Sequence, residues 1–225
     1  VFGKFLNCGQ TCVAPDYIYC DRSIKIDLIH EIKKQMQKQY KSDPLSNKNY
    51  GKIINEKHFD RILGLIEQNK VVYGGQSDRS RLKIAPTLMD NVTFDDAVMS
   101  EEIFGPVLPI LTYDNLDMVI EKINSMPHPL ALYLFTSDKA IAKKVTSHCG
   151  FGGGCINDTI IHLATSNMGF GGFGESGMGS YHGLDGFRTF SHYKSIVDKK
   201  TWLDLPMRYQ PYRKIHDKLI HMFLR

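Results

Sequence analysis

The sequence has no long apolar run and no recognisable targeting segment. None of its apolar stretches reaches the roughly 20 residues that a membrane-spanning helix needs, and the closing residues 215–224 include an aspartate, a lysine and two histidines. The first residues, VFGKFLN, contain neither a starting methionine nor the apolar core of a signal peptide. We therefore expect no integral membrane segment and a location in the cytoplasm.

Cysteine is scarce and irregularly placed. The chain of 225 residues has five, an odd number, without a C-x-x-C pair, and its 42% hydrophobic content is enough for a buried core that needs no disulfides. A zinc site would need two close pairs of cysteine or histidine, but after Cys8, Cys12 and Cys20 the next cysteine is Cys149. The pattern predicts free thiols in a reducing compartment and no metal site.

Strong charge of either sign is also lacking. The formal net charge is +4, and the basic excess lies between residues 192 and 225, where aromatic residues, prolines and aspartates interrupt it. The sequence has no dense basic run and no nucleic-acid-binding module. We expect no nucleic-acid partner, and we interpret the basic tail as a solvated face or a segment docked on a partner subunit.

Apolar periodicity predicts alternating helices and strands. Helices are expected over residues 23–40, from Asn55 to about residue 66, over 116–125 and over 139–147. Their N-caps would be Ser23, Asn55, Asp114 or Asn115, and Ser137 or Asp138. Strands are expected at residues 71–73, 84–89, 107–113 and 130–135. This alternation is typical of an α/β fold with a mainly parallel, twisted sheet flanked by helices.

Residues 150–186 form a glycine-rich segment that is too irregular for a repeat and too apolar for a flexible linker. Within it, residues 172–177, GFGESG, formally satisfy the G-x-G-x-x-G pattern of dinucleotide-binding turns. That pattern should follow an apolar strand, and the preceding SNMGFG is not one. We therefore reject a dinucleotide site here and expect backbone that another group approaches closely.

Residues 7–15, NCGQTCVAP, place Cys12 where it could act as a nucleophile. Gly9 permits a tight turn, and backbone N–H groups beside the sulfur can lower a thiol pKa and donate to an oxyanion. A free cysteine is also commonly a small buried apolar residue. On spacing alone both interpretations of Cys12 remain open.

Four motifs in order resemble the aldehyde dehydrogenase superfamily. NxGQxCxA at residues 7–14 resembles its active-site cysteine motif, and QTCVAPDY at 10–17 resembles the class 3, or fatty-aldehyde-like, branch. The others are EEIFGPV at 101–107, preceded by APT at 85–87, PLALY at 129–133, and FGGFGESGMGSYHG at 170–183. The resemblance covers residues 1–195 and implies the catalytic-domain fold of that family.

The resemblance implies a role for each motif residue. Cys12 would attack an aldehyde as a thiolate, giving a thiohemiacetal whose hydride passes to NAD or NADP and a thioester that water hydrolyses, with Cys8 and Cys20 as spectators. Glu102 would accept hydrogen bonds from the nicotinamide ribose, and Phe104 would contact the nicotinamide. Glu101 is expected to be solvated.

The resemblance also places Tyr181 and His182 at the aldehyde pocket, although a histidine satisfied within its loop remains an alternative for His182. Asn157 and His162 are expected to be structural. The partners implied are a small-molecule aldehyde and a second copy of the chain in a homodimer.

Three elements that the family needs lie upstream of its cysteine motif: a general-base glutamate, an oxyanion asparagine and a dinucleotide-binding domain. We therefore expect residues 1–190 to be a catalytic domain, 191–225 a basic tail, and the N-terminal dinucleotide-binding domain to be absent, with little activity from this chain alone. Two alternatives are a cysteine hydrolase or acyltransferase that uses Cys12 with His182 as base, and a non-catalytic dimerisation module.

Overall fold

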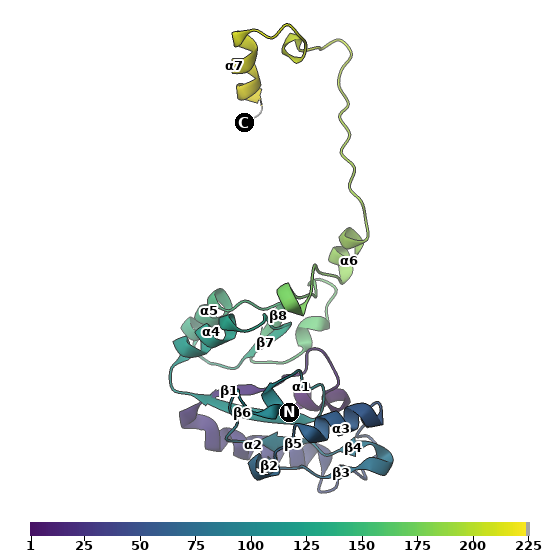
Figure 1. Cartoon of the computed structure of the whole chain (residues 1–225), viewed down its shortest axis with the longest axis vertical. Coiled ribbons are helices and arrows are strands. Elements are labelled where there is room, and N and C mark those ends of the chain that lie inside the picture. Colours follow the sequence, from purple (N-terminus) through teal and green to yellow (C-terminus); the bar gives the residue numbers. More distant parts are fainter. Residues whose placement is uncertain (224–225) are drawn as a thin grey trace. The chain divides into compact units, whose positions relative to one another are not determined.

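The computed structural model describes residues 1–223 and divides the chain into two compact units, Val1–Phe190 and Ser191–Arg225 (Figure 1). The first unit contains two sheets with helices packed on them and a short β3–β4 pair, and it holds every predicted site residue. The regular elements in the described part of the second unit are short helices.

The main sheet of the first unit has four strands in the order β1 (Ile18–Asp21), β6 (Val107–Tyr113), β5 (Thr87–Met89) and β2 (Val71–Tyr73). The pairs β1–β6 and β5–β6 are parallel, and β2 is antiparallel to β5. The first five residues of β6 are buried, as expected for a central strand whose near-continuous apolar run faces helices on both sides. The predicted α/β fold with a mainly parallel sheet is confirmed.

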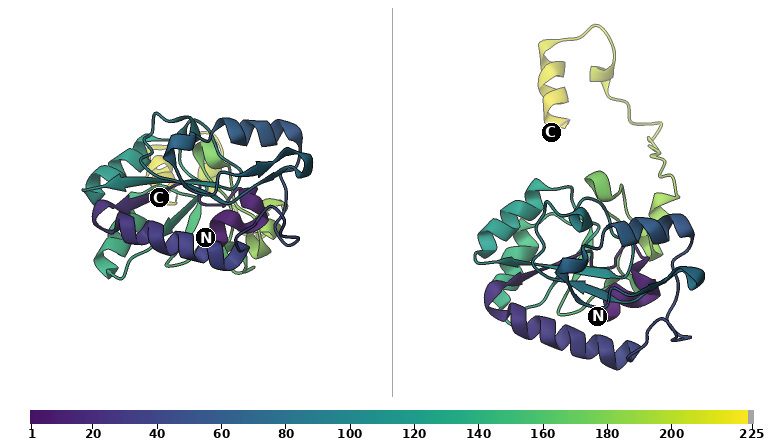
Figure 2. Two further views of the ribbon diagram at one scale, coloured as in Figure 1. Left: turned by 90° about the horizontal axis from the view of Figure 1, so that it is seen from below. Right: turned by 60° about the horizontal axis from the view of Figure 1, so that its bottom comes forward.

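Helices cover both faces of this sheet, because successive strand residues point to opposite sides. Leu108 and Ile110 of β6 pack with α2 (Lys25–Tyr40), whereas Val107 and Leu111 pack with α3 (Glu56–Gly64). Figure 2 shows the two helices on opposite sides of the strands. The candidate site is therefore built on a rigid, doubly covered layer.

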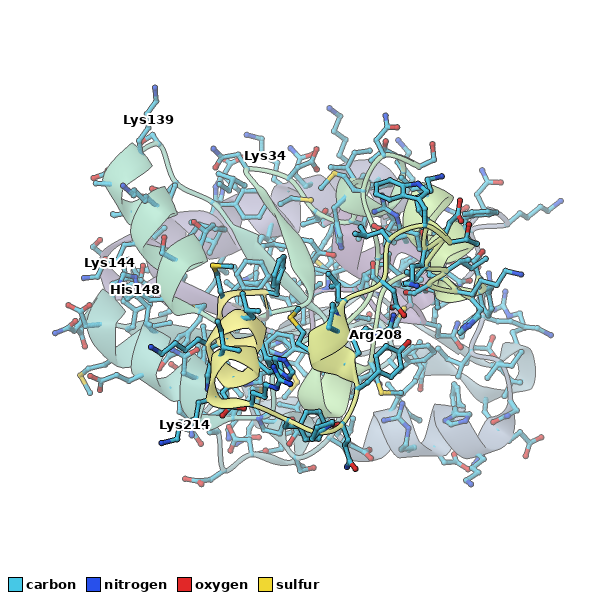
Figure 3. All side chains as sticks on the ribbon, turned by 90° about the horizontal axis from the view of Figure 1, so that it is seen from above. Lys34, Lys139, Lys144, His148, Arg208 and Lys214 are labelled. Carbon is cyan, nitrogen blue, oxygen red and sulfur yellow. The ribbon has the colours of Figure 1, made fainter. Side chains whose placement is uncertain are left out.

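A second, smaller sheet pairs β7 (Ala131–Leu134) with β8 (Gly153–Ile156) in parallel. Helices α4 (Leu116–Ser125) and α5 (Lys139–His148) pack on one face of it, against Leu132 and Leu134. Lys144 of α5 forms an ion pair with Asp117 of α4, and Figure 3 shows Lys144 and His148 together on α5. The opposite face carries Tyr133 and Cys155, which are cross-strand partners.

The remaining elements are short. They are α1 (Phe2–Phe5), β3 (Ser77–Asp78), β4 (Lys83–Ile84), α6 (Gly183–Thr189) and the 3-10 turns η1 (Leu6–Gly9), η2 (Arg22–Ile24), η3 (Gln68–Lys70), η4 (Arg79–Arg81), η5 (Ala97–Met99), η6 (Ile161–Leu163) and η7 (Gly174–Ser176). β3 and β4 form an antiparallel pair.

Most predicted elements are present, with two corrections. Asn55, Asn115 and Asp138 cap their helices as expected. Ser23 is not an N-cap, because the Asp21 side chain accepts from the Ser23 N–H at 2.9 Å and opens η2 before α2 begins. The single strand expected at residues 84–89 is two strands, since Pro86 has no N–H to continue a ladder between β4 and β5.

The second unit begins as extended chain and continues into η8 (Pro206–Arg208) and α7 (Lys214–Phe223). Asp204 forms ion pairs with Lys199 and with Arg208, which Figure 3 labels. The apolar side chains of the second unit are mostly exposed: Trp202 is 80% exposed and Val197 is 89% exposed. Across residues 1–223, no helix combines the length and the apolar character needed to cross a bilayer.

Candidate active site

The segment that leads to Cys12 has an unusual backbone. Asn7, Cys8 and Gly9 follow one another with positive φ angles of 49°, 57° and 73°, a conformation that costs energy for residues other than glycine. A Cβ on Gly9 would lie 2.2 Å from the Gly105 carbonyl oxygen. Only glycine therefore allows the cysteine loop to approach the turn at residues 101–105 so closely.

Gln10 fixes this loop to a neighbouring segment. Its Nε2 donates to the carbonyl oxygens of Asn7 at 3.1 Å and Lys52 at 3.0 Å, and its Oε1 accepts from the Ile54 N–H at 3.0 Å. Cys12 follows on the exposed side of the loop. The thiol is thus presented by backbone that is held before any ligand arrives.

The other two cysteines of the N-terminal region have a different environment. Cys8 and Cys20 are 2% and 5% exposed and lie in two different clusters of the core. Burial raises the pKa of both thiols, which keeps them protonated at neutral pH. Cys12 is the exposed one of the three.

A series of aromatic rings connects the cysteine loop to the glycine-rich segment. The Tyr133 hydroxyl donates to the carbonyl oxygen of Val13, next to Cys12, at 2.8 Å. The Tyr133 ring lies 5.9 Å from His162, and His162 lies 6.1 Å from Phe170. Phe170 in turn stacks on His182 at 5.7 Å and meets Tyr181 edge-on at 5.6 Å. The predicted pocket residues are therefore in one packed series with the segment that presents Cys12.

The turn that carries Glu102 is held by charged groups. Arg61 of α3 donates to the carbonyl oxygens of Glu102 at 3.2 Å and Ile103 at 2.6 Å, and pairs with Glu101 at 3.0 Å. Asp16, four residues after Cys12, accepts from the Ile103 N–H at 3.1 Å. Glu101 is exposed, as expected of a solvated side chain, and its carboxylate also forms the ion pair with Arg61.

Glu102 and Phe104 are both exposed. Phe104 has a positive φ of 44°, which turns the chain sharply just before Gly105. Partial burial, followed by the negative charge of Asp16, raises the pKa of Glu102. A carboxylate acceptor beside an open aromatic face fits the ribose and nicotinamide end of a dinucleotide. These two residues could hold that end of a dinucleotide cofactor.

Lys4 is a buried charge beside this turn that sequence reasoning missed. It is 1% exposed, its Nζ lies 3.9 Å from Asp16, and it has no hydrogen-bond partner within the described residues. Burial lowers its pKa to about 8, against the opposing attraction of Asp16 and Glu102. A single lysine in the apolar stretch VFGKFL was the available signal.

The loop after β8 closes against the N-terminal helix. A Cβ on Gly3 of α1 would lie 2.3 Å from Oγ1 of Thr159, and the β-branched Ile160 has a φ of 54°. Asn157 donates to the Thr136 carbonyl and accepts from the Thr136 N–H, the structural role expected of it. This strained loop lies next to the segment that leads to Cys12.

Comparison with known proteins identifies this arrangement. A family model described as "Aldehyde dehydrogenase family" matches residues 1–196. The chain belongs to the aldehyde dehydrogenase family.

Curated aldehyde dehydrogenases are similar along most of the chain. A 4,4'-diaponeurosporen-aldehyde dehydrogenase of Staphylococcus aureus is 49% identical over 94% of this chain and 47% of its own length. A dimeric NADP-preferring aldehyde dehydrogenase of Bos taurus is 45% identical over 87% of this chain and 82% of that sequence. The family 3 member H1 of Arabidopsis thaliana is 43% identical over 95% of this chain and 45% of its own. The resemblance to the class 3 branch is confirmed.

Solved aldehyde dehydrogenases share the fold. A substrate-bound Staphylococcus aureus AldH superimposes with a TM-score of 0.93 at 47% identity, covering 100% of this chain and 49% of that one. A Mycobacterium tuberculosis aldehyde dehydrogenase complexed with NAD+ gives a TM-score of 0.77 at 27% identity, over 90% of this chain and 43% of that one. The chain thus spans about half the length of the relatives that it matches in structure.

Proposed function

We propose that this chain is the catalytic portion of an NAD(P)-dependent aldehyde dehydrogenase that oxidises an aldehyde to a carboxylic acid, with Cys12 as the nucleophile. The observation that carries the proposal is the position of Cys12: an exposed thiol on a loop that meets the Glu102 turn at Gly9. The same loop contacts the aromatic series ending at Tyr181 and His182 through Tyr133. Family membership supports the reaction class.

In this proposal Cys12 Sγ adds to the carbonyl carbon of the aldehyde to form a thiohemiacetal, and after loss of hydride it carries a thioester that water hydrolyses. The backbone held by Gln10 keeps the sulfur and the neighbouring N–H groups in place, so that little reorganisation is needed as charge develops on oxygen. Cys8 and Cys20 do not compete, because they are buried.

Glu102 and Phe104 would hold the nicotinamide ribose and ring of NAD or NADP, which supplies the hydride acceptor when bound. The relatives support either cofactor, since one is named NADP-preferring and one structure contains NAD+. Tyr181 and His182 would line the entry for the aldehyde. Because the chain spans about half the length of such relatives, we expect little NAD(P)-dependent turnover from these 225 residues alone.

For assembly, we propose residues 1–190 as a catalytic domain and 191–225 as a basic tail. The exposed apolar side chains of the tail, with Trp202 80% exposed, support contact with a second copy in a homodimer. A relative named as dimeric is in line with this.

The alternative of a cysteine hydrolase with His182 as base has less support. His182 stacks on Phe170 and packs on Tyr181. Among the described residues no hydrogen bond joins it to Cys12. Ester cleavage that is lost in His182→Ala but needs no NAD(P) would revive this alternative.

The first experiment is alkylation of the folded chain with iodoacetamide at several pH values, with each cysteine followed by peptide mass spectrometry. We expect Cys12 to react at least about tenfold faster than Cys8 and Cys20, because exposure and thiolate character control the rate. Cys12→Ser, in which no other cysteine should gain reactivity, is the control. If Cys12 reacts no faster than the buried cysteines, the assignment of the nucleophile is wrong.

A further inference from the structure

A second cysteine in the first unit has a histidine within contact distance. Cys155 Sγ lies 3.6 Å from Nδ1 of His162, seven residues later in the chain. Sulfur hydrogen bonds are longer than those of oxygen, so this distance allows the thiol to donate to the imidazole. The sequence motifs gave Cys155 no role and treated His162 as structural.

The fold explains why the two side chains meet. Gly153 and Cys155 are two apart on β8 and therefore point to the same face of the small sheet. A Cβ on Gly153 would lie 3.1 Å from the His162 ring, so the absence of a side chain there makes room for the imidazole. The ring then reaches Cys155, the cross-strand partner of Tyr133.

This face of the sheet is the one that meets the cysteine loop. Tyr133 projects from it to donate to the carbonyl oxygen beside Cys12. Burial raises the pKa of Tyr133, so its hydroxyl stays protonated and available as a donor. Cys155 is partly exposed, whereas Cys149 on the same small sheet region is buried.

His162 has the properties of a general base. It is 8% exposed, and its Nε2 has no hydrogen-bond partner among residues 1–223. Burial lowers its pKa from the usual value, so the imidazole is neutral at pH 7. Leaving a buried polar atom without a hydrogen bond costs free energy of folding. When the neutral imidazole carries its proton on Nε2, its Nδ1 is free to accept the thiol proton.

We propose that Cys155 and His162 form a second reactive thiol site, which takes α,β-unsaturated aldehydes by conjugate addition. The sulfur of Cys155 forms a bond to the β-carbon, the π electrons of the C=C bond move toward the carbonyl, and the thiol proton passes to Nδ1 of His162. The α-carbon then takes up that proton, which restores the aldehyde and the neutral imidazole. No oxidant or cofactor is consumed.

The proposal is independent of the role of Cys12, and its test removes that residue. The Cys12→Ser chain is treated with trans-2-hexenal at pH 7, reduced with borohydride to fix the adduct, and digested for peptide mass spectrometry. We expect one hexenal adduct on Cys155 and none on Cys149, which is buried and has no histidine partner in the described chain.

His162→Asn separates the base from the hydrogen bond, because an asparagine carbonyl can accept from the thiol but cannot take up its proton. We expect adduct formation at Cys155 to slow by about a hundredfold or more, the lower end of the range for general acid–base catalysis. His58→Asn, which removes an exposed imidazole from α3, is the matched control and should leave the rate unchanged.

Equal rates of adduct formation at Cys155 with and without His162→Asn, both in the Cys12→Ser chain, would overturn the proposal. Where circular dichroism shows that His162→Asn does not fold, the parent chain alone decides: adduct formation at Cys155 no faster than at the buried Cys8, Cys20 and Cys149 is also a refutation.

Discussion

The loop that carries Cys12 and the turn that carries Glu102 meet at Gly9, yet different interactions hold them. The loop depends on neutral amide hydrogen bonds from Gln10. The turn depends on charges, with Arg61 on its carbonyl groups, Asp16 on its N–H, and buried Lys4 behind Asp16. The comparison teaches that one molecule can hold the loop that carries Cys12 by neutral groups that do not titrate, while the turn that carries Glu102 is held by charged groups that do.

The largest effect is expected where the two parts meet. Gly9→Ala would combine a positive φ with a Cβ 2.2 Å from the Gly105 carbonyl oxygen, so we expect a loss of about 3 kcal/mol or more in the free energy of unfolding. Urea unfolding followed by circular dichroism measures it. Gly179→Ala is the control, because Gly179 has a φ of 75° but open space around it and should lose only about 1–2 kcal/mol. Similar losses in both variants would show that the close approach is not limiting.

The second prediction concerns Lys4 and pH. Burial holds its pKa at about 8 in the folded chain, against 10.5 in the unfolded chain, so between these values the unfolded chain binds more protons and stability rises with pH. Relative to Lys4→Met, the parent should gain up to roughly 3 kcal/mol between pH 8 and 10.5. The difference between the two unfolding free energies is the quantity to plot, since the ionisation of tyrosines in the unfolded chain cancels from it. A difference that stays constant with pH would contradict a lowered pKa for the buried Lys4 ammonium group.

The smallest loss in the free energy of unfolding is expected in the loop that the neutral Gln10 side chain holds. Gln10→Ala removes three hydrogen bonds from a partly exposed residue, and we expect a loss of about 1–2 kcal/mol. Because Gln10 does not titrate, the loss should be the same at pH 7 and pH 10. Gln39→Ala, an equal truncation on the exposed side of α2, should cost almost nothing. A loss that varies with pH would show that the loop also depends on charge.

Much of the fold could be predicted because its signals are local. The apolar run of β6 and the side-chain caps at Asn55, Asn115 and Asp138 depend on neighbouring residues only. Strand β8 was missed because Gly153 and Gly154 have low strand propensity, and the strand exists through its pairing with β7. The glycine at position 154 leaves room for the Leu132 carbonyl, 1.9 Å from where a Cβ would be.

The residues of the candidate site were predicted through motif resemblance, but the residues that hold them in place were not. Nothing local to Arg61 indicates that it will clamp carbonyl groups 41 and 42 residues away. Asp16 and Lys4 likewise acquire their roles only when distant segments meet. The contact between Cys155 and His162 depends on a glycine two positions before the cysteine, a relation visible only once the strand and its face are known.

The position of Trp202 determines what fluorescence can observe in this protein. It is the single tryptophan of the chain, 80% exposed, and it lies in the second unit. Tryptophan emission therefore reports on the surroundings of Trp202, while the first unit contains tyrosines and no tryptophan. Emission at the long wavelengths of a solvated indole should shift to shorter wavelengths if a second copy covers this segment, as proposed above. Tryptophan emission spectra recorded over a range of protein concentrations would follow association of two copies separately from the folding of the unit that holds Cys12.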